Sequence, residues 1–179
     1  RRKPAVDTAE LLRYDKYSMT HITGSVLDIL IYVFDRYMLS DGPEVPERDE
    51  LAQDLERAGF EQANVERALD WLADLAGERN QELPAATAAQ SSMRVFTDSE
   101  LSRLSAECRG YLMSLERTGI LSALQREIVI DRLLALESEE LDVEQLKWVV
   151  LMVLSSQPGA EIACSRMEDI VWGSSERPH

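Results

Sequence analysis

The chain has 179 residues, 45% of them hydrophobic and 29% charged, which is the composition of an ordinary folded protein that needs no metal or disulfide to stabilise its core. Its net charge is −14, and because residues 1–18 carry five bases against three acids, the rest of the chain carries −16. A body of that charge repels nucleic-acid phosphates; it is consistent with an acidic surface for a basic partner protein, and equally with acidity that serves only solubility.

Residues 1–24 form a basic N-terminal segment. The sequence RRKPAVDTAELLRYDKYS has a weak helical pattern around residues 9–14, and Met19 follows it. We expect the folded domain to start at or after Met19, with residues 1–18 an arm, a tag or an upstream read-through. A native first helix is the alternative.

Residues 25–78 are predicted to form an acidic N-terminal helical unit. Its first helix begins after Ser25, a residue type that caps helix N-termini. An apolar stripe at helical spacing then runs from Val26 to Met38. The sequence Asp41-Gly42-Pro43 ends this helix.

Two short helices are predicted to follow as a tight hairpin. In the first, PERDELAQDLERAGF, Pro46 takes a first-turn position and Gly59 ends the helix. The second, EQANVERALDWLADLAG, has its own apolar stripe with Trp71 beside it. The turn Ala58-Gly59-Phe60 joins them.

A linker at 79–96 separates this unit from a predicted C-terminal helical bundle at 97–172, and 173–179 form a tail. The sequence TDSE at 97–100 is a capping box. It opens a helix that stops at Gly119 and carries one apolar stripe: Leu101, Leu104, Cys108, Leu112 and Leu115.

Three more helices complete the predicted bundle. Ser122 and Asp142 cap the first two, and an amphipathic helix at about 160–172 is the third. LKWVVLMVL, at 146–154, is apolar on nearly every side, which indicates the central helix of the bundle. No strand alternation is visible, so the predicted fold class is all-α, a multi-helix bundle of about six to seven helices. Whether the two units pack together stays open.

Few residues suggest a cofactor, a metal or a membrane. The two histidines stand near the ends of the chain, and no apolar run approaches the roughly 20 residues that cross a bilayer. The cysteines, Cys108 and Cys164, form no CxxC pair, which favours free thiols in a reducing compartment. We therefore expect a cytoplasmic protein that has no membrane segment, needs no cofactor and has no catalytic or metal site.

Cys108 lies beside Arg109, and a neighbouring positive charge can activate a thiol. The apolar stripe places Cys108 on the core face of its helix, and no histidine is available as its general base. We interpret Cys108 as a core residue; a thiol redox switch there is the weaker alternative.

Gly110 is less expected than the cysteine, because a glycine inside a helix costs roughly 1 kcal/mol relative to alanine. Close approach of another backbone, or of a partner, would explain it. Arg109 and Gly110 are therefore candidate interaction residues.

The predicted hairpin gives the other candidates: Asp49, Glu50, Asp54, Arg67 and Trp71. Its acidic pairs occupy first turns, where they favour the helix dipole, so they do not indicate acid–base catalysis. The hairpin also has the form of a helix-turn-helix. However, residues 40–82 carry thirteen acids and four bases, which disfavours insertion into a DNA groove.

Several strings, taken in order, resemble the Smg protein family, a proteobacterial domain of unknown function. They include VLDILIYVFDRYM, LAQDLERAGFEQANVERALDWLADL, SMRVFTDSE, LSAECRGYLMSLERTGIL, REIVIDRLLAL, LDVEQLKWVVLMVL and MEDIVW. The resemblance covers about residues 26–172, so residues 1–24 depart from it. It implies a small cytoplasmic bacterial protein with no established activity, cofactor or catalytic residues.

The sequence thus predicts a non-enzymatic, acidic helical protein that binds a partner with a basic or amphipathic surface. An adaptor or regulatory role is expected. The alternative is a helix-turn-helix regulator associated with nucleic acid in DNA processing or translation, because genes of the family often neighbour genes for those processes.

Overall fold

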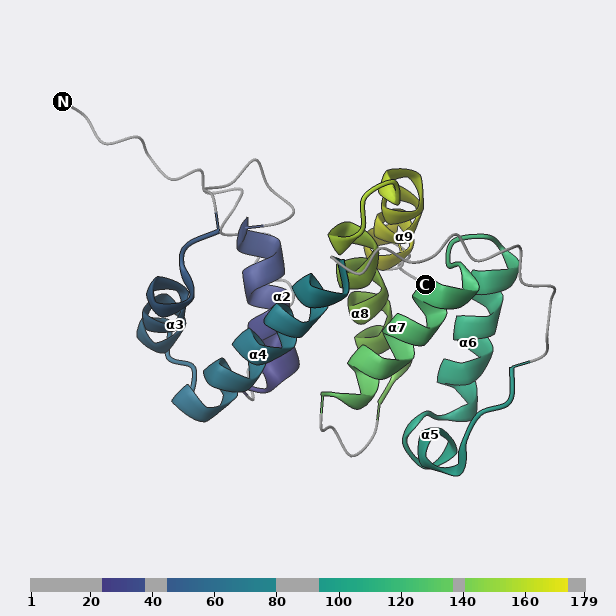
Figure 1. Ribbon diagram of the computed structural model, residues 1–179, viewed down its shortest axis with the longest axis horizontal. Coiled ribbons are helices and arrows are strands. Elements are labelled where there is room, and N and C mark those ends of the chain that lie inside the picture. The colour runs from purple at the N-terminus through teal and green to yellow at the C-terminus, as the bar shows by residue number, and fades with distance from the viewer. Residues whose placement is uncertain (1–23, 38–44, 80–93, 137–140, 174–179) are drawn as a thin grey trace.

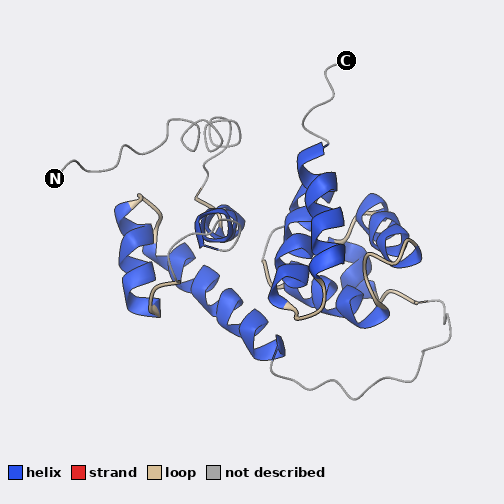
Figure 2. Ribbon diagram, turned by 90° about the horizontal axis from the view of Figure 1, so that it is seen from above, coloured by secondary structure: helices blue, strands red, loops and turns tan. Residues whose placement is uncertain are grey.

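The computed structural model describes residues 24–37, 45–79, 94–136 and 141–173, which form eight helices and no strand (Figures 1 and 2). The helices are α2 (Val26–Tyr37), α3 (Arg48–Arg57), α4 (Gln62–Arg79), α5 (Asp98–Arg103), α6 (Ala106–Arg117), α7 (Ala123–Leu134), α8 (Val143–Ser156) and α9 (Glu161–Gly173). The predicted all-α fold is confirmed. The expectations for residues 1–23, for the turn at 41–43 and for most of the linker and tail lie outside the described residues.

The helices begin at the capping residues that the sequence predicts. Thr97, Ser122 and Asp142 each accept a hydrogen bond from the backbone N–H three residues later, and the side chain of that third residue accepts one in return. Ser25 and Asp28 form the same reciprocal pair at the start of α2. Each pair satisfies two backbone donors that a helix N-terminus leaves without partners.

The helix ends also follow the sequence. Gly59, with φ +99°, follows α3, and Gly119, with φ +73°, follows α6. Glycine adopts this left-handed conformation without the steric cost of a Cβ. The start of α3 differs from the prediction: the helix begins at Arg48 after the extended residue Glu47, so Pro46 precedes the first turn and does not lie in it.

The prediction of a single helix from residue 97 to Gly119 is wrong, because the structure has two helices there, α5 and α6. Leu104 is extended and pairs with Leu141 in an isolated parallel bridge. The hydroxyl of Ser105 then accepts a hydrogen bond from the Cys108 N–H and caps a new helix. As a result Leu101 leaves the predicted stripe and is 46% exposed, whereas Leu104 and Cys108 are buried.

α8 is the central helix, as its sequence predicts. It contacts α2, α4, α6, α7 and α9. Every residue from Val149 to Leu154 is buried, Met152 and Leu154 among them, so these side chains are not an exposed anchor for a partner. Among the described helices, none combines the length and the apolar character that crossing a bilayer needs.

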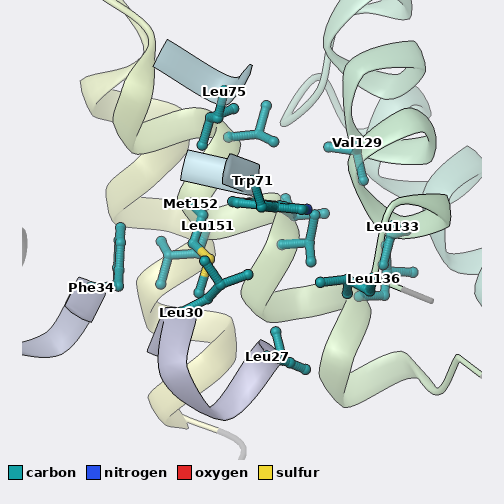
Figure 3. Close-up of a cluster of buried hydrophobic side chains, with 14 of the residues drawn as sticks. Leu27, Leu30, Phe34, Trp71, Leu75, Val129, Leu133, Leu136, Leu151 and Met152 are labelled. Carbon is teal, nitrogen blue, oxygen red and sulfur yellow. The ribbon is translucent and has the colours of Figure 1, made fainter. Parts of the chain in front are cut away.

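Trp71 joins the two predicted units. Its side chain is 3% exposed, and its indole N–H donates to the backbone carbonyl of Arg132 at 2.9 Å. Figure 3 shows the ring between Met152 of α8 and Leu133 near the end of α7, within one continuous apolar cluster. The two helical units, whose relation the sequence left open, therefore share a core. Trp71 is buried, so it is not the surface interaction residue that we expected.

We expect Trp71→Phe to lower the free energy of unfolding by about 1–3 kcal/mol, because it leaves the buried Arg132 carbonyl without its donor and reduces the volume of the side chain. Urea denaturation followed by circular dichroism measures this change. Trp148→Phe, at a half-buried position of α8, is the matched control and should cost less. Equal stability of Trp71→Phe and the parent, or two separate unfolding transitions, would contradict the shared core.

Candidate interaction surface

The candidate residues other than Trp71 fall in two separate places. Asp49, Glu50, Asp54 and Arg67 lie on α3 and α4, whereas Arg109 and Gly110 lie on α6. In Figure 1, α3 and α6 occupy opposite ends of the molecule, and α7 and α8 lie between them. The two sets therefore do not form one site.

We call residues 45–77, which include α3 and the described side chains of α4, the acidic hairpin. They carry nine acids and three bases. α3 has two buried side chains, Leu51 and Leu55, and packs mainly against α4. Asp49 and Glu50 are exposed, and both views place α3 at the edge of the molecule (Figures 1 and 2). Most of the surface of α3 is therefore free of the core.

One exposed face of α3 gathers Asp49, Gln53 and Glu56, because residues three and four apart in a helix lie above one another. Asp54 lies beside this face, and its carboxylate accepts a hydrogen bond from Arg57 at 2.9 Å. This ion pair involves neither Asp49 nor Glu56, so the two carboxylates of the face keep their negative charge.

Arg48 fastens the start of α3 to the outward face of α4. One nitrogen of its guanidinium donates to Glu66 at 2.9 Å and to Asp70 at 2.8 Å. These hydrogen bonds raise the pKa of Arg48 above its ordinary value, and the bond to Glu66 has the larger effect. Arg48 thus bridges the two helices, while Asp49 and Glu50 beside it stay exposed.

The outward face of α4 carries Glu66, Asp70 and Asp74, all exposed, beside the base Arg67. A recognition helix places such a face against the major groove, where carboxylates meet phosphates of the same charge. This face of the hairpin therefore disfavours the helix-turn-helix alternative.

An aromatic pair borders the acidic hairpin at its turn. The rings of Tyr32 on α2 and Phe60 meet edge to face, with 5.6 Å between their centroids and 68° between their planes. Both side chains are half-buried. The guanidinium of Arg36 lies over the ring of Tyr32, 6.0 Å from its centroid. The sequence did not predict this pair, because Tyr32 comes from α2 and Phe60 from the turn between α3 and α4.

Arg109 is engaged within the chain. Its guanidinium donates to the backbone carbonyl of Leu104 and lies 5.8 Å from the centroid of Phe96. Gly110 is exposed, and a Cβ added to it would meet no atom within 4 Å. The expected close approach of another backbone from this chain is therefore wrong; contact with a partner stays a prediction.

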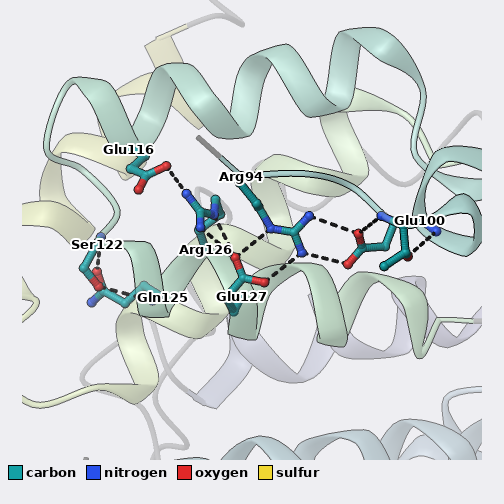
Figure 4. Close-up of polar contacts among 8 residues, drawn as sticks. Arg94, Glu100, Glu116, Ser122, Gln125, Arg126 and Glu127 are labelled. Carbon is teal, nitrogen blue, oxygen red and sulfur yellow. Dashed lines mark hydrogen bonds and ion pairs between the residues drawn. The ribbon is translucent and has the colours of Figure 1, made fainter. Parts of the chain in front are cut away.

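A row of ion pairs that the sequence did not predict holds the C-terminal helices together (Figure 4). Arg94 donates to both oxygens of Glu100, at 2.7 and 3.0 Å, and to both oxygens of Glu127, each at 2.7 Å. Arg126 then links Glu127 to Glu116. The row joins the segment before α5 to α5, α7 and α6.

Arg94 and Glu100 are both close to fully buried, with side chains 11% and 13% exposed. The hydrogen bonds from Arg94 are the largest cause that lowers the pKa of Glu100 to about 2, and they also lower the pKa of Glu127. Burial opposes both shifts. The carboxylates of Glu100 and Glu127 therefore stay ionised at neutral pH and stabilise the fold as ion pairs.

The thiols are placed as the sequence predicts for Cys108. Its side chain is fully buried, and its Sγ donates to the backbone carbonyl of Leu141 at 3.2 Å. This burial contradicts a redox switch at Cys108, which needs an accessible thiolate. At Cys164, burial is the main cause that raises the pKa of the thiol, whose Sγ lies 3.1 Å from the Oγ of Ser155.

One cavity of about 230 Å³ opens where α2 begins. Its lining residues are Ser25, Val26, Leu27, Asn64, Arg67, Leu136 and Gln145. The side-chain amide of Asn64 donates to the carbonyl of Gly24 at 2.9 Å and so ties the entry of α2 to α4. Among the described residues, no three His, Cys, Asp or Glu side chains lie together in a way that could hold a metal ion.

The fold and this surface define an all-α protein with one core and a strongly acidic helical hairpin at its edge. The family described as "Protein of unknown function (DUF494)" matches residues 26–179. Proteins named "Protein Smg homolog" are similar over most of their length. The one from Methylococcus capsulatus is 47% identical over 150 residues, which are 84% of this chain and 94% of that protein.

A second relative, from Aeromonas hydrophila, is 44% identical over 153 residues, which are 84% of this chain and 98% of that protein. A third, from Nitrosococcus oceani, is 46% identical over 148 residues, 83% of this chain and 93% of that protein. No solved structure matches. The chain belongs to the Smg family of bacterial proteins, which the description above calls a family of unknown function.

We expect Glu100→Gln to lower the free energy of unfolding by about 1–3 kcal/mol at pH 7, because glutamine still serves the capping box but does not pair as an ion with Arg94. The folded-state pKa of Glu100 lies below its ordinary 4.5, so the ion pair stabilises the fold above that value and is lost as the pH falls toward about 2.

The difference between Glu100→Gln and the parent should therefore shrink as the pH falls from about 4.5, measured by urea denaturation across a pH series. Glu107→Gln, at an exposed first-turn position of α6, is the control and should change stability by less than about 0.5 kcal/mol. A difference that stays constant down to low pH would show that the ion pair is not its source.

We expect Gly110→Ala to raise the free energy of unfolding by about 0.5–1 kcal/mol, because the position is helical, exposed and open to a Cβ. Thermal and urea denaturation measure the gain. Gly119→Ala is the contrasting variant and should destabilise, since φ there is +73°. Loss of stability in Gly110→Ala would contradict the open surface.

Proposed function

We propose that this protein is a non-catalytic interaction protein of the cytoplasm, an adaptor or regulator that docks a partner with a basic or amphipathic surface on the acidic hairpin. The observation that carries the proposal is the position of α3. This helix adds two buried leucines to the core and presents most of its remaining surface, with Asp49 and Glu50, to solvent. A surface of that kind adds little to stability and suits recognition.

The charges of the hairpin support a basic partner. Residues 45–77 have a surplus of six acids, whereas residues 94–136 contain six acids and six bases. A concentrated negative surface raises the rate at which a positive partner associates and disfavours acidic competitors. The carboxylates of Asp49, Glu50 and Glu56 would then pair with lysine or arginine side chains of the partner.

The aromatic pair at the hairpin turn supports an amphipathic partner over a purely basic one. Tyr32 and Phe60 are half-buried and border the acids of the turn, Glu56 and Glu61. Aromatic faces bind cations and apolar side chains alike, and aromatic residues are frequent among the residues that dominate binding energy at interfaces. An amphipathic helix with lysine or arginine beside an apolar stripe would use both features.

The proposal is tested by affinity capture from a lysate of the source bacterium with three forms of the protein. These are the parent, the hairpin variant Asp49→Asn/Glu50→Gln/Glu56→Gln, and a control variant Glu107→Gln/Glu161→Gln/Asp169→Asn. Both variants change the net charge equally and remove first-turn acids, and all six positions are exposed. Retained proteins are identified by mass spectrometry after nuclease treatment.

We expect a defined protein that the parent and the control retain, that the hairpin variant loses by roughly tenfold or more, and that salt releases. Equal retention by the hairpin variant and the control would contradict docking on the hairpin. Retention that nuclease abolishes would support the nucleic-acid alternative instead, and a steep salt dependence on purified DNA would then confirm it.

A further inference from the structure

We propose that the acidic hairpin is also the docking site of this chain's own basic segment, residues 1–18, which we call the arm. The inference rests on the proposed function, because it makes the arm an internal competitor of the partner for the same surface. Residues 1–18 lie before the part of the chain that matches the family, so this property belongs to this chain and not to the family as a whole.

Charge is the first reason. The arm contains Arg1, Arg2, Lys3, Arg13 and Lys16, and three of these bases are consecutive at its start. Among the described stretches, the acidic hairpin has the largest surplus of acids, six, against three for residues 141–171 and one for residues 24–37. Residues 94–136 have none. Among the described stretches, the hairpin is therefore the surface that attracts the arm most strongly.

The point of attachment is the second reason. The chain enters the described structure at Gly24, and Asn64 in the first turn of α4 holds the carbonyl of Gly24 at 2.9 Å. Residue 24 is thus fixed against the hairpin. The cavity lined by Ser25, Asn64 and Arg67 lies at this junction, so the surface is hollowed where the arm would approach.

Reach is the third reason. A segment of about 20 residues can span at most roughly 70 Å, and the 18 residues of α4 are roughly 27 Å long. Every acid of the hairpin therefore lies within range of Lys3. Because arm and hairpin belong to one chain, their contact is intramolecular and does not depend on the protein concentration.

The lysines of the chain allow a direct test. The sequence has three: Lys3 and Lys16 in the arm, and Lys147, which is buried and pairs with Glu144 at 2.6 Å. A carbodiimide joins a lysine amine to a carboxylate that touches it and adds no atoms. The purified full chain is treated at low and at about 0.5 M salt, and the joined pairs in the monomer are identified by mass spectrometry.

We expect Lys3 and Lys16 to join acids of the hairpin, such as Asp49, Glu56 and Asp70, and these products to fall at least roughly fivefold at high salt, where exposed charges are screened. A Lys147–Glu144 product, if it forms, should change less, because Lys147 is buried and lies three residues from Glu144 in the same helix. Products scattered over the acids of α6, α7 and α9, or found only between two copies, would overturn the inference.

Two further variants keep the lysines in place. Arg1→Gln/Arg2→Gln should reduce the hairpin products of Lys3 and Lys16 by roughly threefold or more, whereas Asp7→Asn/Glu10→Gln, which makes the arm more basic, should not reduce them. If arm and hairpin fail to join but the capture experiment still depends on the hairpin acids, the proposed function stands and this inference fails. If capture is independent of the hairpin as well, both fail.

Discussion

The burial of α8 is the constraint on which the rest of the described structure depends. From Val149 to Leu154 this helix has no side that water reaches, so other helices must cover it all round. α2, α4, α6, α7 and α9 do so, and their own apolar stripes supply the contacts. The ring of Trp71 lies between α8 and α7 in this apolar cluster (Figure 3). The backbone carbonyl of Arg132 accepts the hydrogen of its indole N–H.

The two helices that are not major neighbours of α8 are held in other ways. α3 relies on Leu51, Leu55 and the bridge from Arg48 to α4. α5 has no buried residue of its own and is fastened by its capping box and by the pair between Arg94 and Glu100. Exposed ion pairs of the Arg48 kind contribute little to stability, whereas the pair on α5 is shielded from solvent and contributes more. α3 is thus held mainly by its two buried leucines, and it presents more charge.

The sequence predicted most of the fold, because the signals involved are local. Capping boxes at Thr97, Ser122 and Asp142, glycines after α3 and α6, and an apolar helix at 146–154 each act within a few residues. The break between α5 and α6 was missed because Ser105 is compatible with either a helix interior or a cap. The extended pairing of Leu104 with Leu141, a contact distant in the chain, decides which of the two it becomes.

The candidate surface was only partly predictable for the same reason. The acids of the hairpin are visible in the sequence, but whether a base is available for binding depends on partners far along the chain. Arg94, Arg109 and Arg126 all have their guanidinium groups engaged in the fold by side chains or carbonyls that other segments provide. Residues 94–136 contain six acids and six bases, so the chain's negative surplus lies elsewhere. Among the described residues the largest share of that surplus is on the acidic hairpin, where α3 leaves most of its surface exposed. This combination supports the hairpin as the proposed surface for a positive ligand.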